Sequence, residues 1–130
     1  MAHILIKHSA NLRARINLPR FVQAIQQAAL ASGILPRDAA RTRACEAGGH
    51  GASGPDAGFV HLTVQVGRGR DPAAHRQVCE QLFAAACTQL SGLHGRMPVG
   101  ISVEVQARES APALKPDNIQ DYAVRQLRSA

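Results

Sequence analysis

The sequence predicts an α+β fold in which two β-α-β units form a four-stranded mixed sheet with two helices on one face. Several short stretches are rich in aliphatic residues or alternate apolar with polar residues, as β-strands do. Two longer stretches repeat apolar residues at helical spacing, and each begins with a polar residue and a proline. Strand, helix and strand follow one another twice, and right-handed crossovers would place both helices on the same face. A length of 130 residues suits a single domain over residues 1–130.

The first predicted strand covers residues 2–8. Three adjacent aliphatic residues, Ile4 to Ile6, favour a central strand that is buried on both faces. Because this strand starts the chain, it would carry an α-amino group into the interior. Such a group has a pKa of about 8, so it is a candidate base or nucleophile near neutral pH.

The first predicted helix begins at Asn17, which caps it, with Pro19 in its first turn. Gly33 is a plausible C-cap at its end. Its apolar residues fall on one face, and these are Leu18, Phe21, Val22, Ile25, Ala28 and Ala29.

A second strand is predicted over residues 39–46, although alanine forms strands poorly. Its period of two would place Arg41 and Arg43 on one face. Residues 47–58 are rich in glycine and are predicted to form a loop.

Residues 59–66 give the clearest strand pattern of the chain. Val60, Leu62, Val64 and Val66 share the face that should meet the helices, and the other face carries Phe59, His61, Thr63 and Gln65. Aliphatic residues at every second position, with polar residues at three of the four positions between them, indicate a sheet with one covered face and one open face.

The second unit is completed by a helix and a strand. Asp71 and Pro72 open the helix by the same cap-and-proline device, and glycines at 92 and 95 suggest its end. The last strand is predicted over residues 100–106, and a terminal helix over residues 119–127.

The polar face of the predicted sheet suggests an oligomer. A bare sheet face of this size is usually covered by another subunit. The chain also has only three Phe, one Tyr and no Trp, so its core must be aliphatic, and small cores of that kind often gain stability by association.

Charge and cysteine content narrow the classes of function. The net charge of +6 favours anionic ligands, but the arginines are dispersed and no nucleic-acid motif is present, so nucleic acid is disfavoured. No apolar run reaches the roughly 20 residues of a membrane span, and no signal peptide pattern opens the chain, so we expect a cytoplasmic protein. The three cysteines show no zinc-binding spacing, and we expect no metal and no cofactor.

Three groups of residues are candidates for binding or catalysis. The Gly67–Arg70 stretch is either a strand-to-helix turn or an anion-binding site that uses the guanidinium of Arg70. The Arg41 and Arg43 pair either binds a carboxylate or lies on a solvated edge strand. His61 is either a hydrogen-bonded structural residue at an interface or an acid–base group.

Taken together, these segments resemble the 5-carboxymethyl-2-hydroxymuconate isomerases of the tautomerase superfamily, over nearly the whole chain. Their order and spacing carry the resemblance more than any single motif does. The matching segments are Ser9-x-Asn11-x-Arg13 with Leu18-Pro19, Gly33 to Pro36 with Arg41-x-Arg43, Phe59 to Thr63 with Gly67-x-Gly69-Arg70, and Leu114-Lys115 with Asn118.

The resemblance implies a homotrimer with active sites near the subunit interfaces. Members of this family isomerise an unsaturated dicarboxylate-type product of aromatic catabolism without a cofactor. Their amino-terminal proline shuttles a proton between carbons, and arginines hold the substrate carboxylates. Arg41 and Arg70 match the positions of such arginines.

This sequence departs from the family at two places. The residue after Met1 is Ala2, not proline, so the catalytic amine would be the primary amine of Ala2, and only if Met1 is removed. A retained Met1 would displace the free amine by roughly 3.5 Å, too far for proton transfer. Residues 44–58 hold Gly, Ala and Ser where the family has aromatic residues, which predicts a more open pocket.

These observations support one main hypothesis and two alternatives. The main hypothesis is a family member that binds a small unsaturated keto or enol carboxylate, with tautomerase activity altered or lost because Ala2 replaces proline. The first alternative is a non-catalytic trimeric binding or structural protein with the same fold. The second is an anion-binding or nucleic-acid-binding protein that uses the dispersed arginines.

Overall fold

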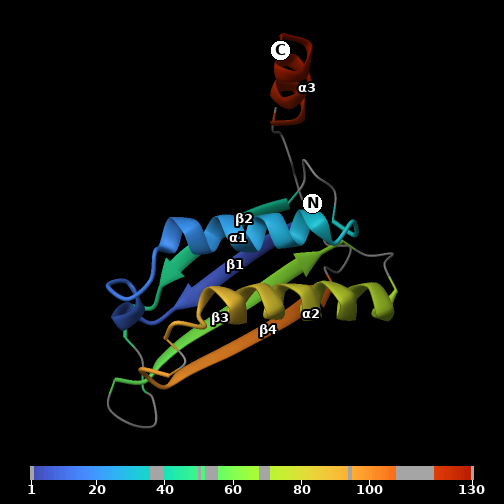
Figure 1. Ribbon diagram of the computed structural model, residues 1–130. Coiled ribbons are helices and arrows are strands. Elements are labelled where there is room, and N and C mark those ends of the chain that lie inside the picture. The colour runs from blue at the N-terminus through green and yellow to red at the C-terminus, as the bar shows by residue number, and fades with distance from the viewer. Residues whose placement is uncertain are drawn as a thin grey trace.

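A computed structural model describes residues 2–35, 40–49, 51, 56–67, 71–93, 95–107 and 119–129. Four strands form one sheet, and two long helices cross one face of it (Figure 1). In chain order the elements are β1 (Ala2–His8), the short 3-10 helix η1 (Ala10–Leu12), α1 (Leu18–Ala31), β2 (Ala40–Glu46), β3 (Gly58–Val66), α2 (Pro72–Gln89), β4 (Val99–Ala107) and α3 (Ile119–Ser129).

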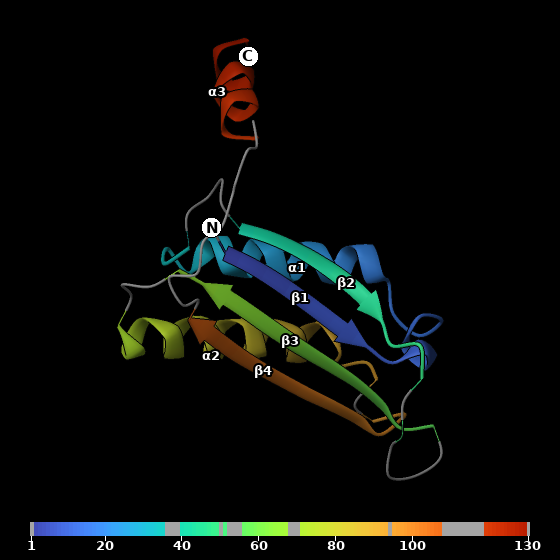
Figure 2. The same cartoon turned by 180° about the vertical axis from the view of Figure 1, so that it is seen from behind.

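The sheet has the strand order β2-β1-β3-β4. Each β-α-β unit supplies a parallel pair of strands, β1 with β2 and β3 with β4, and the two units meet through antiparallel pairing of β1 and β3. The predicted mixed sheet with both helices on one face is therefore confirmed. Seen from behind, the four strands lie in front of the helices, so the second face of the sheet is open (Figure 2).

The cap-and-proline signals mark both helix starts correctly. The side chain of Asn17 accepts a hydrogen bond from the backbone N–H of Arg20 at 3.1 Å. Asp71 accepts one in the same way from Ala74 at 2.7 Å. Each cap satisfies an amide that the helix itself leaves without an acceptor. At the other end of α1, Gly33 adopts a φ of 70°, which glycine takes without steric cost.

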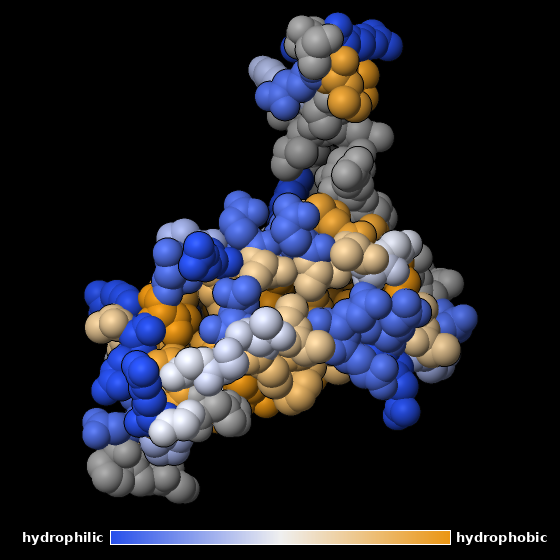
Figure 3. Space-filling model, viewed as in Figure 1, coloured by the Kyte–Doolittle hydropathy of each residue, from blue (hydrophilic) through white to orange (hydrophobic). Residues whose placement is uncertain are grey.

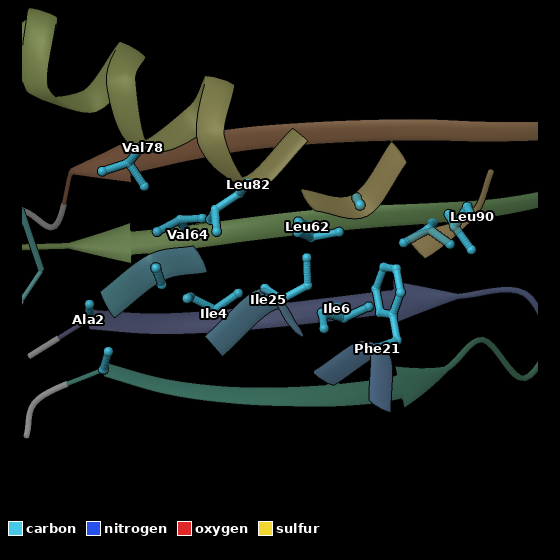
Figure 4. Close-up of a cluster of buried hydrophobic side chains, with 14 of the residues drawn as sticks. Ala2, Ile4, Ile6, Phe21, Ile25, Leu62, Val64, Val78, Leu82 and Leu90 are labelled. Atoms are coloured by element: carbon cyan, nitrogen blue, oxygen red, sulfur yellow. The ribbon is translucent and has the colours of Figure 1, made fainter. Parts of the chain in front are cut away.

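The core lies between the sheet and the two helices and is almost wholly aliphatic. Alternate residues of β1 and β3 point into it and meet one face of each helix (Figure 4). Its fully buried side chains include Ile4, Ile6, Phe21, Ile25, Leu62, Val64, Val78, Leu82 and Leu90. Because α1 and α2 cover only this face, apolar side chains in the strands are needed only at every second position.

The prediction that β1 is buried on both faces is wrong for the single chain. Its burial alternates: Ile4 and Ile6 are buried, Leu5 is half-buried and Lys7 is exposed. No helix of the described residues covers the second face, so the run of three aliphatic residues places the middle one, Leu5, on the open side. The second helix also ends at Gln89, earlier than the glycines at 92 and 95 suggested.

A hydrogen-bonded network joins the end of β1 to the start of β3. The hydroxyl of Ser9 donates to Oδ1 of Asn11 at 2.6 Å and accepts from the backbone N–H of Phe59 at 3.0 Å. The amide of Asn11 donates to the backbone oxygen of Ala57 at 3.1 Å. The Ser9-x-Asn11 motif is thus structural, because it fixes the backbone where β3 begins.

The helices of the described residues include none with the length and apolarity that a membrane span requires. The terminal helix α3 stands away from the sheet and its two covering helices (Figure 1), and its Leu127 side chain is 80% exposed.

Candidate functional site

The first residue of β1 lies at the end of the sheet where two strands begin and two end. Ala2 pairs with Ala40 at the start of β2, and β3 and β4 reach the same end after running in the opposite direction. The side chain of Ala2 points toward the helices and is only 2% exposed, beside Ile4 in the core (Figure 4). An amine at this position would therefore lie at the end of a strand whose side chains are already packed.

Arg41 lies next to this end on the open face of the sheet. Its Cα is paired with that of His3, and His3 is paired in turn with Gln65 of β3. Neighbouring strands are about 4.8 Å apart, so the three residues form one row across the sheet. Arg41 is half-buried, whereas Arg43, two residues further along β2, is exposed. The predicted shared face of the two arginines is confirmed, and Arg41 is the more enclosed of the pair.

Hydrogen bonds to α1 hold β2 in place below these arginines. The side chain of Gln26 donates to the backbone oxygen of Ala40 at 3.1 Å and accepts from the hydroxyl of Thr42 at 2.5 Å. Thr42 faces the helices, so Arg41 and Arg43 on either side of it are turned to the open face. The position of Arg41 is set by this contact and by pairing with β1.

Met1 and Arg70 lie outside the described residues, as do the Leu114-Lys115 and Asn118 segments. Gln65 pairs with His3, so β3 ends beside the start of β1.

His61 lies away from Arg41, toward the other end of the sheet. It pairs with Lys7 of β1, four residues along β3 from Gln65, which corresponds to about 13 Å. Its Nδ1 lies 2.5 Å from the hydroxyl of Ser102, and its Nε2 lies 3.5 Å from Oε1 of Glu104. One chain does not bring His61 together with Arg41, and both ring nitrogens already face polar partners on β4, which favours the structural alternative.

Two residues of the row across the sheet could not be recognised from the sequence. The strand register alone places His3 next to Arg41, and Gln65 on the far side of His3. The alternation in each strand did place Gln65 on the open face, but register between strands far apart in the chain is not visible in either strand alone. Among the residues that the structure describes, no group of His, Cys, Asp or Glu side chains could hold a metal ion.

Comparison with known proteins connects this geometry to a family. The 5-carboxymethyl-2-hydroxymuconate isomerase family matches residues 2–123 of this chain. The chain is 25% identical over 126 residues to a 5-carboxymethyl-2-hydroxymuconate Delta-isomerase of Escherichia coli, covering 92% of this chain and 96% of that one.

Solved structures show the same fold. A crystal structure of a 5-carboxymethyl-2-hydroxymuconate delta-isomerase superposes with a TM-score of 0.88 at 21% identity, covering 95% of this chain and 93% of the other. A symmetric trimer of fused wild-type 4-OT superposes with a TM-score of 0.66 at 15% identity, covering 88% of this chain and 92% of the other. Since the family match extends over nearly all of the chain, the protein belongs to the 5-carboxymethyl-2-hydroxymuconate isomerase family.

Proposed function

We propose that this chain binds a small unsaturated keto or enol carboxylate where β1 begins, and that tautomerase activity is altered or lost because Ala2 replaces proline. The observation that carries this proposal is the half-buried Arg41, one strand away from His3 and next to the Ala2–Ala40 pair. A guanidinium in a partly enclosed position binds a carboxylate through two parallel hydrogen bonds. In this proposal Arg70 is a second cation for the ligand.

Arg43 and His61 have weaker support as ligand contacts within one chain. Arg43 is exposed, and His61 lies about 13 Å along the sheet from the row of Arg41. We assign both to the outer part of the binding surface, where a neighbouring subunit would complete the site.

The chemistry that suits this arrangement is a 1,3-proton shift. A neutral amine removes a proton from one carbon of the substrate, and the electron pair of the broken C–H bond moves toward the carbonyl oxygen as an enolate. The resulting ammonium returns the proton to a different carbon, so no atoms are gained or lost. A fixed guanidinium stabilises the negative charge on the substrate more effectively than mobile water does.

Replacing proline by Ala2 weakens the base in this scheme. The primary amine of alanine can still accept a proton or form a Schiff base with a carbonyl. It lacks the ring that fixes the direction of the nitrogen lone pair, and a loss of alignment of about 1 Å can reduce a rate by about a hundredfold. Removal of Met1 is a further condition for any role of this amine.

We also propose that three chains associate through the open face of the sheet. This face carries Leu5 and Thr63 at its centre, both half-buried, with polar and charged side chains around them. The likeness to a symmetric 4-OT trimer supports an association of three chains here. The alternative function, a non-catalytic trimeric binding or structural protein, is favoured by the alanine at position 2, which would preserve the fold and remove the specialised amine.

The first test is an intact-mass measurement followed by an assay. Protein without Met1 should catalyse enol-to-keto conversion of phenylpyruvate-like acids slowly, and Ala2→Pro should raise turnover at least tenfold. Circular dichroism should verify that the variant folds, since Ala2 is buried and proline is larger. A retained Met1 would contradict any mechanism that uses the Ala2 amine. No turnover in either protein would support the non-catalytic alternative.

Binding is tested separately with an arginine pair. Arg41→Gln should weaken binding of a small unsaturated keto acid about tenfold, because a charge-assisted hydrogen bond is lost. Arg76→Gln, on the exposed surface of α2, removes the same charge and is the matched control. Equal affinities in the two variants would contradict the assignment of Arg41 to the site.

A further inference from the structure

A concave site lies at the opposite end of the molecule from Ala2. A cavity of about 300 Å³ opens where α1 begins and α2 ends. The strand β1 runs from the end at Ala2 to this end, and its seven residues span about 20 Å. Hydrophilic side chains gather at the left of the helical face in Figure 3, on the side where α1 begins in Figure 1. The cavity is therefore separate from the site proposed above.

Three arginines from different parts of the chain line this cavity. Arg15 comes from the connection between η1 and α1, Arg20 from the first turn of α1, and Arg96 from the connection between α2 and β4. No aspartate or glutamate is present among the described residues that line it. The neighbouring Arg13 differs, because its guanidinium pairs with Glu46 at 2.8 Å.

The charges of the three arginines are not neutralised within the part of the chain that the structure describes. The ion pairs found there involve other residues, and the side chains of Arg15, Arg20 and Arg96 make no hydrogen bond among the described residues. Three like charges around one hollow repel one another, so a bound anion would relieve an unfavourable interaction and add attractive ones.

The rest of the lining suits a compact ligand. Phe21 and Leu93 are buried and form an apolar base, which reduces the exposure of the cavity to water. Asn17 already uses its side-chain oxygen to cap the amide of Arg20, so that amide is not available to an anion, and the guanidinium groups would supply the main contacts. The volume lies at the lower limit of small-molecule pockets, about 300–1,000 Å³.

We propose that this cavity binds a compact multivalent oxyanion, either a polyphosphate or a tricarboxylate. Guanidinium groups bind both classes through charge-assisted hydrogen bonds, and three of them match an anion with several negative groups better than one with a single charge. The two classes share this recognition chemistry and are distinguished by using both as probes.

The test is isothermal titration with inorganic triphosphate and with citrate, at about 0.15 M KCl to screen nonspecific attraction. We expect saturable binding of at least one probe by the wild-type protein. Arg20→Gln and Arg96→Gln should each weaken that binding about tenfold, and the double variant should weaken it more than either. Arg76→Gln, which lowers the net charge equally outside the cavity, should leave the affinity unchanged.

The outcome separates the two classes and can overturn the proposal. Tighter binding of triphosphate assigns a phosphate ligand, and tighter binding of citrate assigns a carboxylate ligand. Equal losses in Arg20→Gln and Arg76→Gln would show a general charge effect and overturn the proposal, as would the absence of saturable binding of both probes. The three arginines are exposed, so thermal melts of the variants should match that of the wild type. No keto acid is present in these titrations, and the result is independent of the function proposed for the Ala2 site.

Discussion

Gly58 lies against the hydrogen-bonded network of Ser9 and Asn11, and an added methyl group there should destabilise the fold. A Cβ atom there would lie 3.1 Å from the Ser9 hydroxyl, 3.1 Å from Oδ1 of Asn11 and 3.2 Å from the terminal carbon of Met97. The first two atoms are hydrogen-bonded to each other and cannot move without loss. We expect Gly58→Ala to lower the free energy of unfolding by about 1–2 kcal/mol, measured by urea denaturation.

Gly100 provides the matched control for Gly58. It lies on the neighbouring strand, paired with Phe59, and a Cβ there would meet nothing within 4 Å. Gly100→Ala should be neutral or slightly stabilising, because alanine restricts the unfolded chain more than glycine does. Equal destabilisation by the two substitutions would show that the close contacts at Gly58 do not determine its residue type.

For single residues, the sequence predicted which face of the sheet a side chain lies on, but not which side chains lie next to it on the neighbouring strands. Alternation in β2 and β3 correctly placed Arg41 with Arg43 and His61 with Gln65. It could not show that Arg41 lies beside His3, or that His61 lies about 13 Å along the sheet from that row. A one-residue change of register would exchange the two faces of a strand, and register depends on contacts with the whole sheet.

Helix starts are the elements whose energetics can be tested most directly. Asn17→Ala removes the acceptor for the backbone N–H of Arg20, and Asp71→Ala removes the acceptor for that of Ala74. Each should cost about 1 kcal/mol in the free energy of unfolding, measured by urea denaturation. Asn17→Ser and Asp71→Asn keep an acceptor oxygen and should cost less than half as much. If the alanine variants were as stable as these controls, the caps would not contribute to stability.

Element boundaries were predictable at the helix starts and less so elsewhere. A cap followed by proline has a local cause, since both residues act on amides within one turn. The end of α2 at Gln89 has no equally local signal, because the glycines at 92 and 95 lie in the turns beyond it. The burial of β1 was overestimated for a similar reason: three adjacent aliphatic residues do not reveal whether a second layer covers the sheet.

For the whole molecule, the sequence predicted two β-α-β units but not how they join. The units meet through antiparallel pairing of β1 with β3, which places the two most aliphatic strands at the centre and β2 and β4 at the edges. Joining the units brings the start of β1 and the end of β3 to the same place, and with them Ala2, His3 and Gln65. The candidate site therefore combines residues of both units, and the sequence of one unit alone could not reveal it.

Leu5 offers a test of the association proposed for the open sheet face. It lies on the central strand β1, half-buried, and pairs with Arg43 on one side and Thr63 on the other. Leu5→Arg would add a third cation between Arg43 and Lys7, and burial of unpaired like charges at an interface costs several kcal/mol. Light scattering should therefore give three 13.8 kDa chains for the wild-type protein and one chain for the variant.

Gln77→Arg on the exposed side of α2 is the matched control for Leu5→Arg, since it adds the same charge outside the sheet face. It should remain a trimer, and both variants should keep the circular dichroism spectrum of the wild type, because the core on the helix side is untouched. A trimeric Leu5→Arg would place the interface elsewhere, and a monomeric wild type would contradict the trimer itself. If dissociation also abolishes keto-acid binding although Arg41 is intact, the neighbouring chain must supply part of the site. In one chain Arg41 lies on an open face, and His61 is about 13 Å away along the sheet.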